Sequence, residues 1–178
     1  FLYSQSHEKT DSIAYYGSLR NANLKANKYK NALFYTQKAI HYSQSIRNVP
    51  EQAYQTFRLG KIYYDLKKYN DAIQTLHKSI TLYKDLNPTS NYGAAYYYLS
   101  LCYIEKSNFA DAEVYLNEAK SIFEKLKTPN TTELINLQKG IILKSKGDLE
   151  QASTLFKSII AKPDNPVLLD RKAEALYQ

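Results

Sequence analysis

The sequence contains no methionine, no tryptophan and only one cysteine among its 178 residues. A single cysteine cannot form a disulfide within the chain, so cysteine usage does not identify the redox compartment. Cys102 also lacks a histidine at a helical spacing, since the three histidines are His7, His41 and His77. We therefore interpret Cys102 as a buried structural thiol rather than a nucleophile.

Residue patterns that carry chemistry are missing as well. The five glycines form no phosphate-binding loop, and no spacing of serine, histidine and aspartate indicates a catalytic triad. His41 and His77 have no cysteine or acidic cluster one helical turn away, as a metal site on a helix requires. We expect no catalytic residue, no metal and no cofactor, and hence a protein that is not an enzyme.

Arginine and long apolar runs are scarce. The formal net charge is +7, but only Arg20, Arg47, Arg58 and Arg171 are arginines, and the lysines fall on the outer positions of nearly every expected helix. A nucleic-acid-binding surface usually concentrates both residue types in one stripe. No run approaches the ~18 apolar residues of a membrane span. We therefore expect a solvated basic surface that contacts neither nucleic acid nor membrane.

What the chain does contain is a repeat. Ala32, Ala72, Ala112 and Ala152 are spaced 40 residues apart without a slip. The flanking residues repeat too, with Tyr29, Tyr69, Phe109 and Leu149 three before each alanine, and Thr36, Leu76, Leu116 and Phe156 four after it. These offsets share one helical face. A second amphipathic helix centres twelve residues earlier, on Arg20, Gly60, Ser100 and Gly140. Each unit is therefore a helix–turn–helix hairpin.

The joints of the hairpins are short and polar. They are Asn27-Lys28, Lys67-Lys68, Ser107-Asn108 and Gly147-Asp148. We expect several of them to cap the following helix or to hold a left-handed residue. All five prolines, Pro50, Pro88, Pro129, Pro163 and Pro166, fall where one hairpin joins the next. A residue without an amide hydrogen can end a helix there.

On these residues the sequence resembles the tetratricopeptide repeat (TPR) family. The second copy matches best, with Leu59, Gly60, Tyr63, Tyr69, Ala72, Leu76 and Ser79 at the positions of the family pattern. Arg20, Asn23 and Lys139 depart from that pattern, so we expect the first and fourth hairpins to pack less regularly. The resemblance implies an all-α fold, a right-handed superhelical α-solenoid of helix–turn–helix hairpins. The long repeat resembles the TPR regions of bacterial signalling proteins.

The repeat also predicts boundaries within the chain. They are an N-terminal extension at 1–10, repeats at 11–48, 49–88, 89–128 and 129–164, and the first helix of a truncated fifth repeat or a capping helix at 165–178. The period exceeds the common length of about 34 residues. We expect the second helix of each hairpin to take up the extra length.

The resemblance implies that the first helix of each hairpin lines a concave groove. The phase of the repeat assigns to this groove Tyr54, Phe57, Arg58, Lys61, Tyr64, Tyr97, Leu101, Ile104, Leu137, Ile141 and Lys144. An amphipathic helix or an extended apolar peptide would suit it, and its basic residues would hold carboxylates. Members of the family that bind chaperone tails use a clamp of lysine, asparagine and arginine, and this sequence matches it only in part, with Asn21 and Lys61. The alternative to a ligand-binding groove is that these aromatic residues pack within a tightly wound superhelix.

These observations predict a non-enzymatic module that binds a protein or peptide. One hypothesis is the sensor or interaction region of a larger bacterial signalling protein, a histidine kinase or a transcription regulator, with an effector domain beyond Gln178. The alternative is a stand-alone scaffold for multiprotein assembly or self-association, including a homo-oligomer. The apolar start at Phe1-Leu2-Tyr3-Ser4 is either the remnant of an export signal or ordinary interior sequence. The compartment stays open, with the bacterial periplasm favoured over the cytoplasm.

Overall fold

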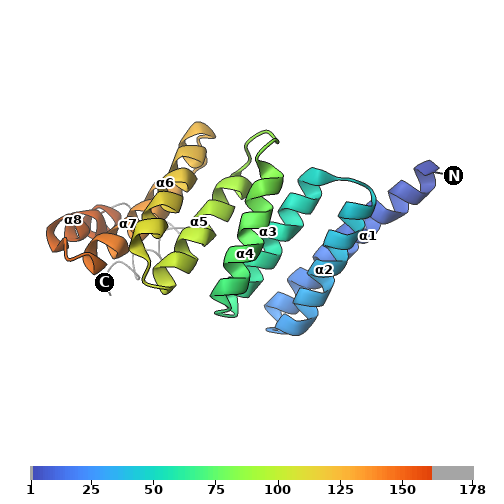
Figure 1. The fold of residues 1–178 in the computed structure, drawn as a ribbon, viewed down its shortest axis with the longest axis horizontal. Helices are drawn as coiled ribbons and strands as arrows, with labels where there is room; N and C mark the ends of the chain where they lie inside the picture. Colours follow the sequence, from blue (N-terminus) through green and yellow to red (C-terminus); the bar gives the residue numbers. More distant parts are fainter. Residues whose placement is uncertain (1, 162–178) are drawn as a thin grey trace. The chain divides into compact units, whose positions relative to one another are not determined.

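The computed structural model describes residues 2–161, which form α-helices and no strands (Figure 1). In chain order the helices are α1 (Leu2–Lys25), α2 (Tyr29–Ser45), α3 (Val49–Asp65), α4 (Tyr69–Tyr83), α5 (Ser90–Glu105), α6 (Phe109–Lys125), α7 (Thr131–Ser145) and α8 (Leu149–Ile160). The predicted all-α fold built from hairpins is confirmed. The first helix of a fifth repeat, predicted at 165–178, lies outside the described residues.

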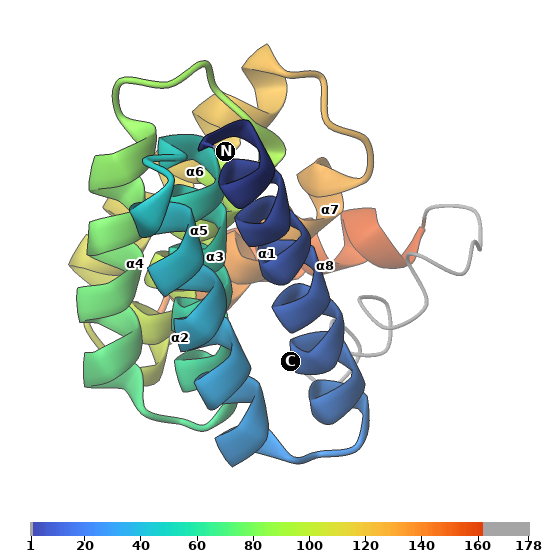
Figure 2. The same cartoon turned by 90° about the vertical axis from the view of Figure 1, so that its right-hand side faces the viewer.

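The helices form two compact units, Phe1–Asn87 (unit 1) and Pro88–Gln178 (unit 2). In unit 1, α1 pairs with α2 and α3 with α4, while α2 also packs against α3 (Figure 2). In unit 2, α5 pairs with α6 and α7 with α8, and α6 packs against α7. Each unit therefore contains two consecutive hairpins that pack against each other.

Small residues let the helices of a hairpin approach closely. The repeating alanines Ala32, Ala72, Ala112 and Ala152 are all buried. A Cβ atom added to Gly60 would lie 2.8 Å from Cγ of Leu76 on the facing helix. One added to Gly140 would lie 2.8 Å from Cζ of Phe156. Because real Cβ contacts are not this short, glycine allows the close approach at both positions.

The predicted hairpin joints each contain a left-handed residue. The φ angles of Asn27, Lys67, Ser107 and Gly147 are 55°, 58°, 56° and 89°. In the second hairpin the amide of Lys68 donates to the carbonyl of Tyr63 at 2.9 Å, and that of Lys67 to Tyr64 at 2.8 Å. This bonding pattern is the Schellman ending of a helix. The side chains of Asn108 and Asp148 also cap the following helices, α6 and α8.

We expect Lys67→Gly to raise the free energy of unfolding by about 0.5–1 kcal/mol. A left-handed residue with a Cβ costs roughly 1–2 kcal/mol, which glycine avoids, although glycine loses more entropy on folding. Urea titration followed by circular dichroism measures the change. The reverse substitution at the equivalent joint, Gly147→Ala, should lower stability. Equal stability of Lys67→Gly and the unmodified chain would contradict this account of the joint.

Two predictions about the joints and helix lengths need correction. Pro50 does not lie between helices, because it occupies the first turn of α3, where a missing amide hydrogen is tolerated. The second helix does not take up the extra length in every hairpin, since α4 with 15 residues is shorter than α3 with 17, although α6 with 17 residues is longer than α5 with 16. Pro88 and Pro129 do lie between hairpins. Pro163 and Pro166 lie outside the described residues.

The beginning of the first repeat remains a prediction. Helix α1 runs from Leu2 to Lys25 and therefore includes residues 2–10, where the sequence predicted an extension. Within residues 2–161, no helix is both long and apolar enough to cross a membrane.

Candidate functional site

Three of the predicted groove residues lie in hairpin cores. Phe57, Tyr97 and Leu137 are 5%, 8% and 2% exposed. Tyr97 packs in a core cluster of unit 2 that includes Leu116. Leu137 packs with Phe156 in a second cluster of the same unit. In the described conformation these three side chains stabilise the hairpins and present little surface to a ligand.

The other predicted groove residues keep some exposure. Half-buried are Tyr54, Arg58, Lys61 and Tyr64 on α3, Leu101 and Ile104 on α5, and Ile141 on α7, whereas Lys144 on α7 is exposed. The first helices of both units thus carry large, partly accessible side chains. Lys61 is not available as a lone cation, because its Nζ lies 2.9 Å from Oδ2 of Asp65.

Side chains from α1 and α3 meet in what we call the arginine cluster: Arg20, Asn21, Tyr54, Gln55 and Arg58. Arg58 donates from Nη2 to Oδ1 of Asn21 and from Nη1 to the hydroxyl of Tyr54, both at 3.1 Å. Arg20 donates from Nε to the same Oδ1 at 3.2 Å and from Nη1 to Oε1 of Gln55. Both guanidinium groups also lie within 6 Å of the Tyr54 ring centre, at 5.9 Å and 5.8 Å. The two first helices of unit 1 are therefore linked by polar side chains.

Arg20 occupies the repeat position at which Gly60 stands in the next hairpin. Its side chain is only 2% exposed. Burial lowers its pKa, and the positive charge of Arg58 lowers it further. Lys139, another departure from the repeat pattern, is exposed. The repeat pattern predicts a small residue at position 20, and the contact of Arg20 with Gln55 of the following hairpin carries no periodic signal.

Stacked tyrosines lie between first and second helices. In unit 2, the Tyr115 ring stacks on Tyr96 and Tyr103, with centroids 6.3 Å and 5.3 Å apart. Burial and the hydrogen bond with Tyr92 raise the pKa of Tyr96, so its hydroxyl stays protonated. In unit 1, Tyr16 stacks on Tyr35 and Tyr42. The 40-residue period would have revealed these pairs, because Tyr16 and Tyr35 stand two repeats before Tyr96 and Tyr115.

A cavity of about 480 Å³ opens in unit 1 among α2, α3 and α4. It is lined by Ile40, Gln44, Gln52, Thr56, Leu59, Thr75, Lys78, Thr81 and Leu82. Its volume is in the range of small-ligand sites. The groove predicted along the first helices gave no reason to expect this cavity, because residues of the second helices α2 and α4 line it as well.

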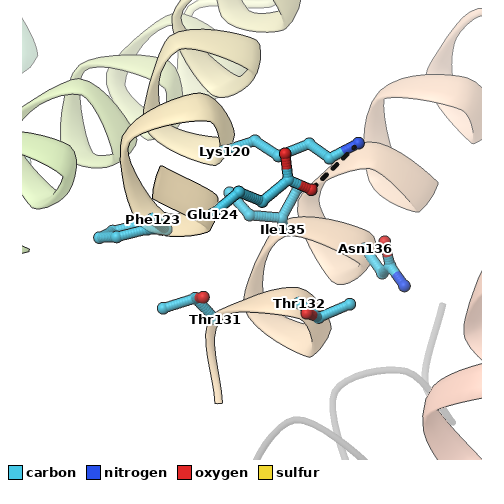
Figure 3. A pocket seen from close by; sticks show the side chains of 7 residues that line it. All are labelled: Lys120, Phe123, Glu124, Thr131, Thr132, Ile135 and Asn136. Carbon is cyan, nitrogen blue, oxygen red and sulfur yellow. Dashed lines mark ion pairs between the residues drawn. The ribbon is translucent and has the colours of Figure 1, made fainter. Parts of the chain in front are cut away.

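A smaller pocket of about 30 Å³ lies in unit 2 between the end of α6 and the start of α7 (Figure 3). It is lined by Lys120, Phe123, Glu124, Thr131, Thr132, Ile135 and Asn136. Lys120 and Glu124 form an ion pair of 3.7 Å on one wall. The volume suits one or two water molecules and no larger ligand.

Cys102 is buried, as the sequence predicted. Burial raises the pKa of its thiol to about 12, with a further contribution from the negative charge of Glu105. The thiol therefore stays protonated near neutral pH, which is unfavourable for a nucleophile. Among the residues that the structure describes, no group of three or more histidine, cysteine, aspartate or glutamate side chains could hold a metal ion.

The fold is that of a repeat protein built from TPR-like helical hairpins. Residues 52–125 match the tetratricopeptide repeat family, which confirms the resemblance seen in the sequence. This segment includes α4, α5 and α6 entirely and most of α3. Among curated proteins, none matches the sequence significantly.

Several solved structures share the fold. The apo form of RapI is similar with a TM-score of 0.75 and 15% identity, over 83% of this chain and 54% of RapI. The Rap conjugation gene regulator of the plasmid pLS20, in complex with a Phr peptide, has a TM-score of 0.75 and 17% identity, over 99% and 51% of the two chains. A kinesin light chain from Podosopora anserina with TPR-like repeats has a TM-score of 0.73 and 14% identity, over 93% and 84%. The chain thus spans about half the length of the two Rap proteins.

Proposed function

We propose that the chain is a non-catalytic module that binds a protein or peptide along the first helices of its hairpins. The observation that carries the proposal is the partial exposure of large side chains at the predicted positions of these helices. Tyr54 and Tyr64 on α3, Leu101 and Ile104 on α5, and Ile141 on α7 are all half-buried. A ligand that covers those of either unit gains roughly 25 cal/mol per Å² of apolar surface removed from water, before entropy costs.

The structural neighbours support a peptide as the ligand. One Rap regulator of the same fold was solved with a Phr peptide bound. At 17% identity this likeness shows the fold alone, so the ligand of this chain is inferred from its own side chains. These combine half-buried aromatic and aliphatic groups with basic groups. That combination suits an amphipathic helix or an extended apolar peptide that carries acidic residues.

The wider role we propose is the sensor or interaction region of a larger bacterial signalling protein, such as a histidine kinase or a transcription regulator. The observation behind this context is the 40-residue repeat, which is longer than the common repeat of about 34 residues. The alternative is a scaffold that holds other chains or copies of itself. Analytical ultracentrifugation separates the two, because a scaffold based on self-association should sediment as an oligomer at micromolar concentration.

We expect Tyr64→Ala to weaken peptide binding by at least about tenfold, because a central aromatic residue at an interface contributes about 2 kcal/mol or more. A library of random twelve-residue peptides is first selected for binding to the unmodified chain. Fluorescence anisotropy then gives the dissociation constant of each selected peptide for the variant. Circular dichroism must show that the variant keeps its helices.

The matched control is Phe34→Ala, which removes an aromatic residue that is 53% exposed on the second helix α2. It should leave the dissociation constants unchanged. Peptides that bind Tyr64→Ala as well as they bind the unmodified chain would contradict the proposed site. Unfolding of Tyr64→Ala would show that the side chain belongs to the core.

A further inference from the structure

We propose that the cavity of about 480 Å³ in unit 1 binds a small uncharged molecule that carries an amide group on an apolar body. The cavity is bounded by α2, α3 and α4, and α3 packs against both other helices. Its lining residues on α3 are Gln52, Thr56 and Leu59, whose spacing places them on one helical face. The opposite face of α3 carries Tyr54 and Lys61. The cavity is therefore a site separate from the proposed peptide-binding positions.

The repeat supplies an internal comparison, because residues 80 positions apart are equivalent in the two units. Lys120 of unit 2 is equivalent to Ile40 of unit 1. Glu124 is likewise equivalent to Gln44. Lys120 and Glu124 form an ion pair of 3.7 Å, and the pocket that they line has a volume of only about 30 Å³ (Figure 3). The larger space in unit 1 is therefore a property of its own residues and does not follow from the repeat alone.

The cavity is lined by polar side chains that have unused hydrogen-bonding capacity. Thr75 on α4 is only 9% exposed. The hydroxyls of Thr56 and Thr81 donate to carbonyl oxygens one helical turn earlier, at 2.7 Å and 3.0 Å. Within residues 2–161, the side chains of Thr75, Gln44 and Gln52 form no hydrogen bond. Since buried polar groups are normally bonded, the Thr75 hydroxyl in particular indicates a ligand contact.

The lining also indicates the chemical class of the ligand. Ile40, Leu59 and Leu82 provide apolar surface. A carboxamide presents donor hydrogens beside an acceptor oxygen, and another amide complements this arrangement. Lys78 is the only charged residue among the nine that line the cavity, and it is exposed. It would repel a cation, and a single exposed lysine contributes little to the binding of an anion. An uncharged amide with an apolar body therefore fits the lining.

The amide group can come from two sources, which differ in geometry. A ring such as a cyclic dipeptide holds the amide in the cis form, with N–H and C=O on one edge. A linear blocked amino acid holds it in the trans form. Because the lining comes from both hairpins of unit 1, a ligand of either kind would link them and stabilise the folded unit.

Nuclear magnetic resonance of the methyl groups tests the proposal on the full chain. Three probes are titrated: cyclo(Leu-Leu) for the cis amide, N-acetylleucine N-methylamide for the trans amide, and methyl 2-acetoxy-4-methylpentanoate as the control. The control has esters in place of both amides of the linear probe and lacks their N–H donors. We expect the methyl signals of Thr75 and Ile40 to shift saturably with at least one amide. The ester should bind at least about tenfold more weakly than that amide, because the carboxamide oxygens lose their donors. The signal of Thr132, in the small pocket of unit 2, should stay in place.

Thr75→Leu should weaken the binding of the amide by at least about tenfold, because it fills the cavity with the residue that unit 2 has at this position, Leu155. The matched control is Gln74→Leu, since Gln74 is exposed on the same helix and does not line the cavity. Tyr64→Ala should also leave amide binding unchanged, so failure of the peptide-binding positions and failure of the cavity can be told apart.

The proposal is overturned if neither amide gives a saturable shift, or if the ester binds as tightly as the amides. Binding of the amide to Thr75→Leu with unchanged affinity would overturn it as well. If Thr75→Leu fails to fold, the comparison of the amides with the ester on the unmodified chain decides.

Discussion

Leu116→Ala should lower the free energy of unfolding by about 2–5 kcal/mol, the range observed when a buried leucine is truncated. Leu116 lies on α6 in the core cluster of unit 2, together with Tyr97, Phe123 and Ile135. Truncation removes apolar contacts with side chains of both hairpins and leaves a cavity that the surrounding helices fill only in part. Urea unfolding followed by circular dichroism gives the change.

The matched control for this prediction lies on the same helix. Val114 on α6 is 57% exposed, and Val114→Ala should change stability by no more than about 0.5 kcal/mol. If the two variants lose the same stability, α6 does not pack against α5 and α7 as described.

Ala112→Leu should lower the free energy of unfolding by about 1–3 kcal/mol, because it adds three carbons where the hairpin helices approach most closely. Ala112 is completely buried in the same core cluster as Leu116. The added side chain must displace neighbours that are already packed. Since both a smaller and a larger residue are expected to destabilise this cluster, the pair of variants measures how closely its volume is matched.

Ala110→Leu is the control for the enlargement. Ala110 is also on α6 but is exposed, so its side chain points away from the hairpin interior. The same change in volume and helix propensity should alter stability by no more than about 0.5 kcal/mol there. Equal destabilisation by Ala110→Leu and Ala112→Leu would show that the loss comes from leucine in the helix rather than from packing.

Features that follow from local rules could be predicted from the sequence. The alanine period located the close contacts of the hairpins, and the left-handed residues at Asn27, Lys67 and Ser107 followed from the polar joints. Four copies of one pattern make the assignment of helices more secure, because an assignment made in one copy must hold in the other three. Among the prolines in the described part of the chain, Pro50 was assigned to the wrong element; it stands a single residue inside α3, and helix ends are the least certain part of such predictions.

The burial of individual side chains was harder to predict. Helical phase places Phe57 and Tyr64 on one face of α3, yet Phe57 is buried and Tyr64 is only half-buried. The difference depends on how a neighbouring helix covers that face, which the spacing within one helix does not contain. The contact of Arg20 with Gln55 is of the same kind, because it joins residues of different hairpins and occurs in one copy only.

The position of the arginine cluster makes the order of the repeats matter. Arg20 belongs to the hairpin of α1 and α2, whereas Arg58 belongs to that of α3 and α4, so neither hairpin carries the paired charges alone. The hairpin cores depend on positions that recur in every copy. A rearranged chain in which the first two hairpins are no longer neighbours would therefore keep those positions but separate the two guanidinium groups. Duplication or shuffling of hairpins, a change that repeat proteins tolerate structurally, would therefore keep the hairpin cores of this protein and lose the polar contacts between its first two hairpins.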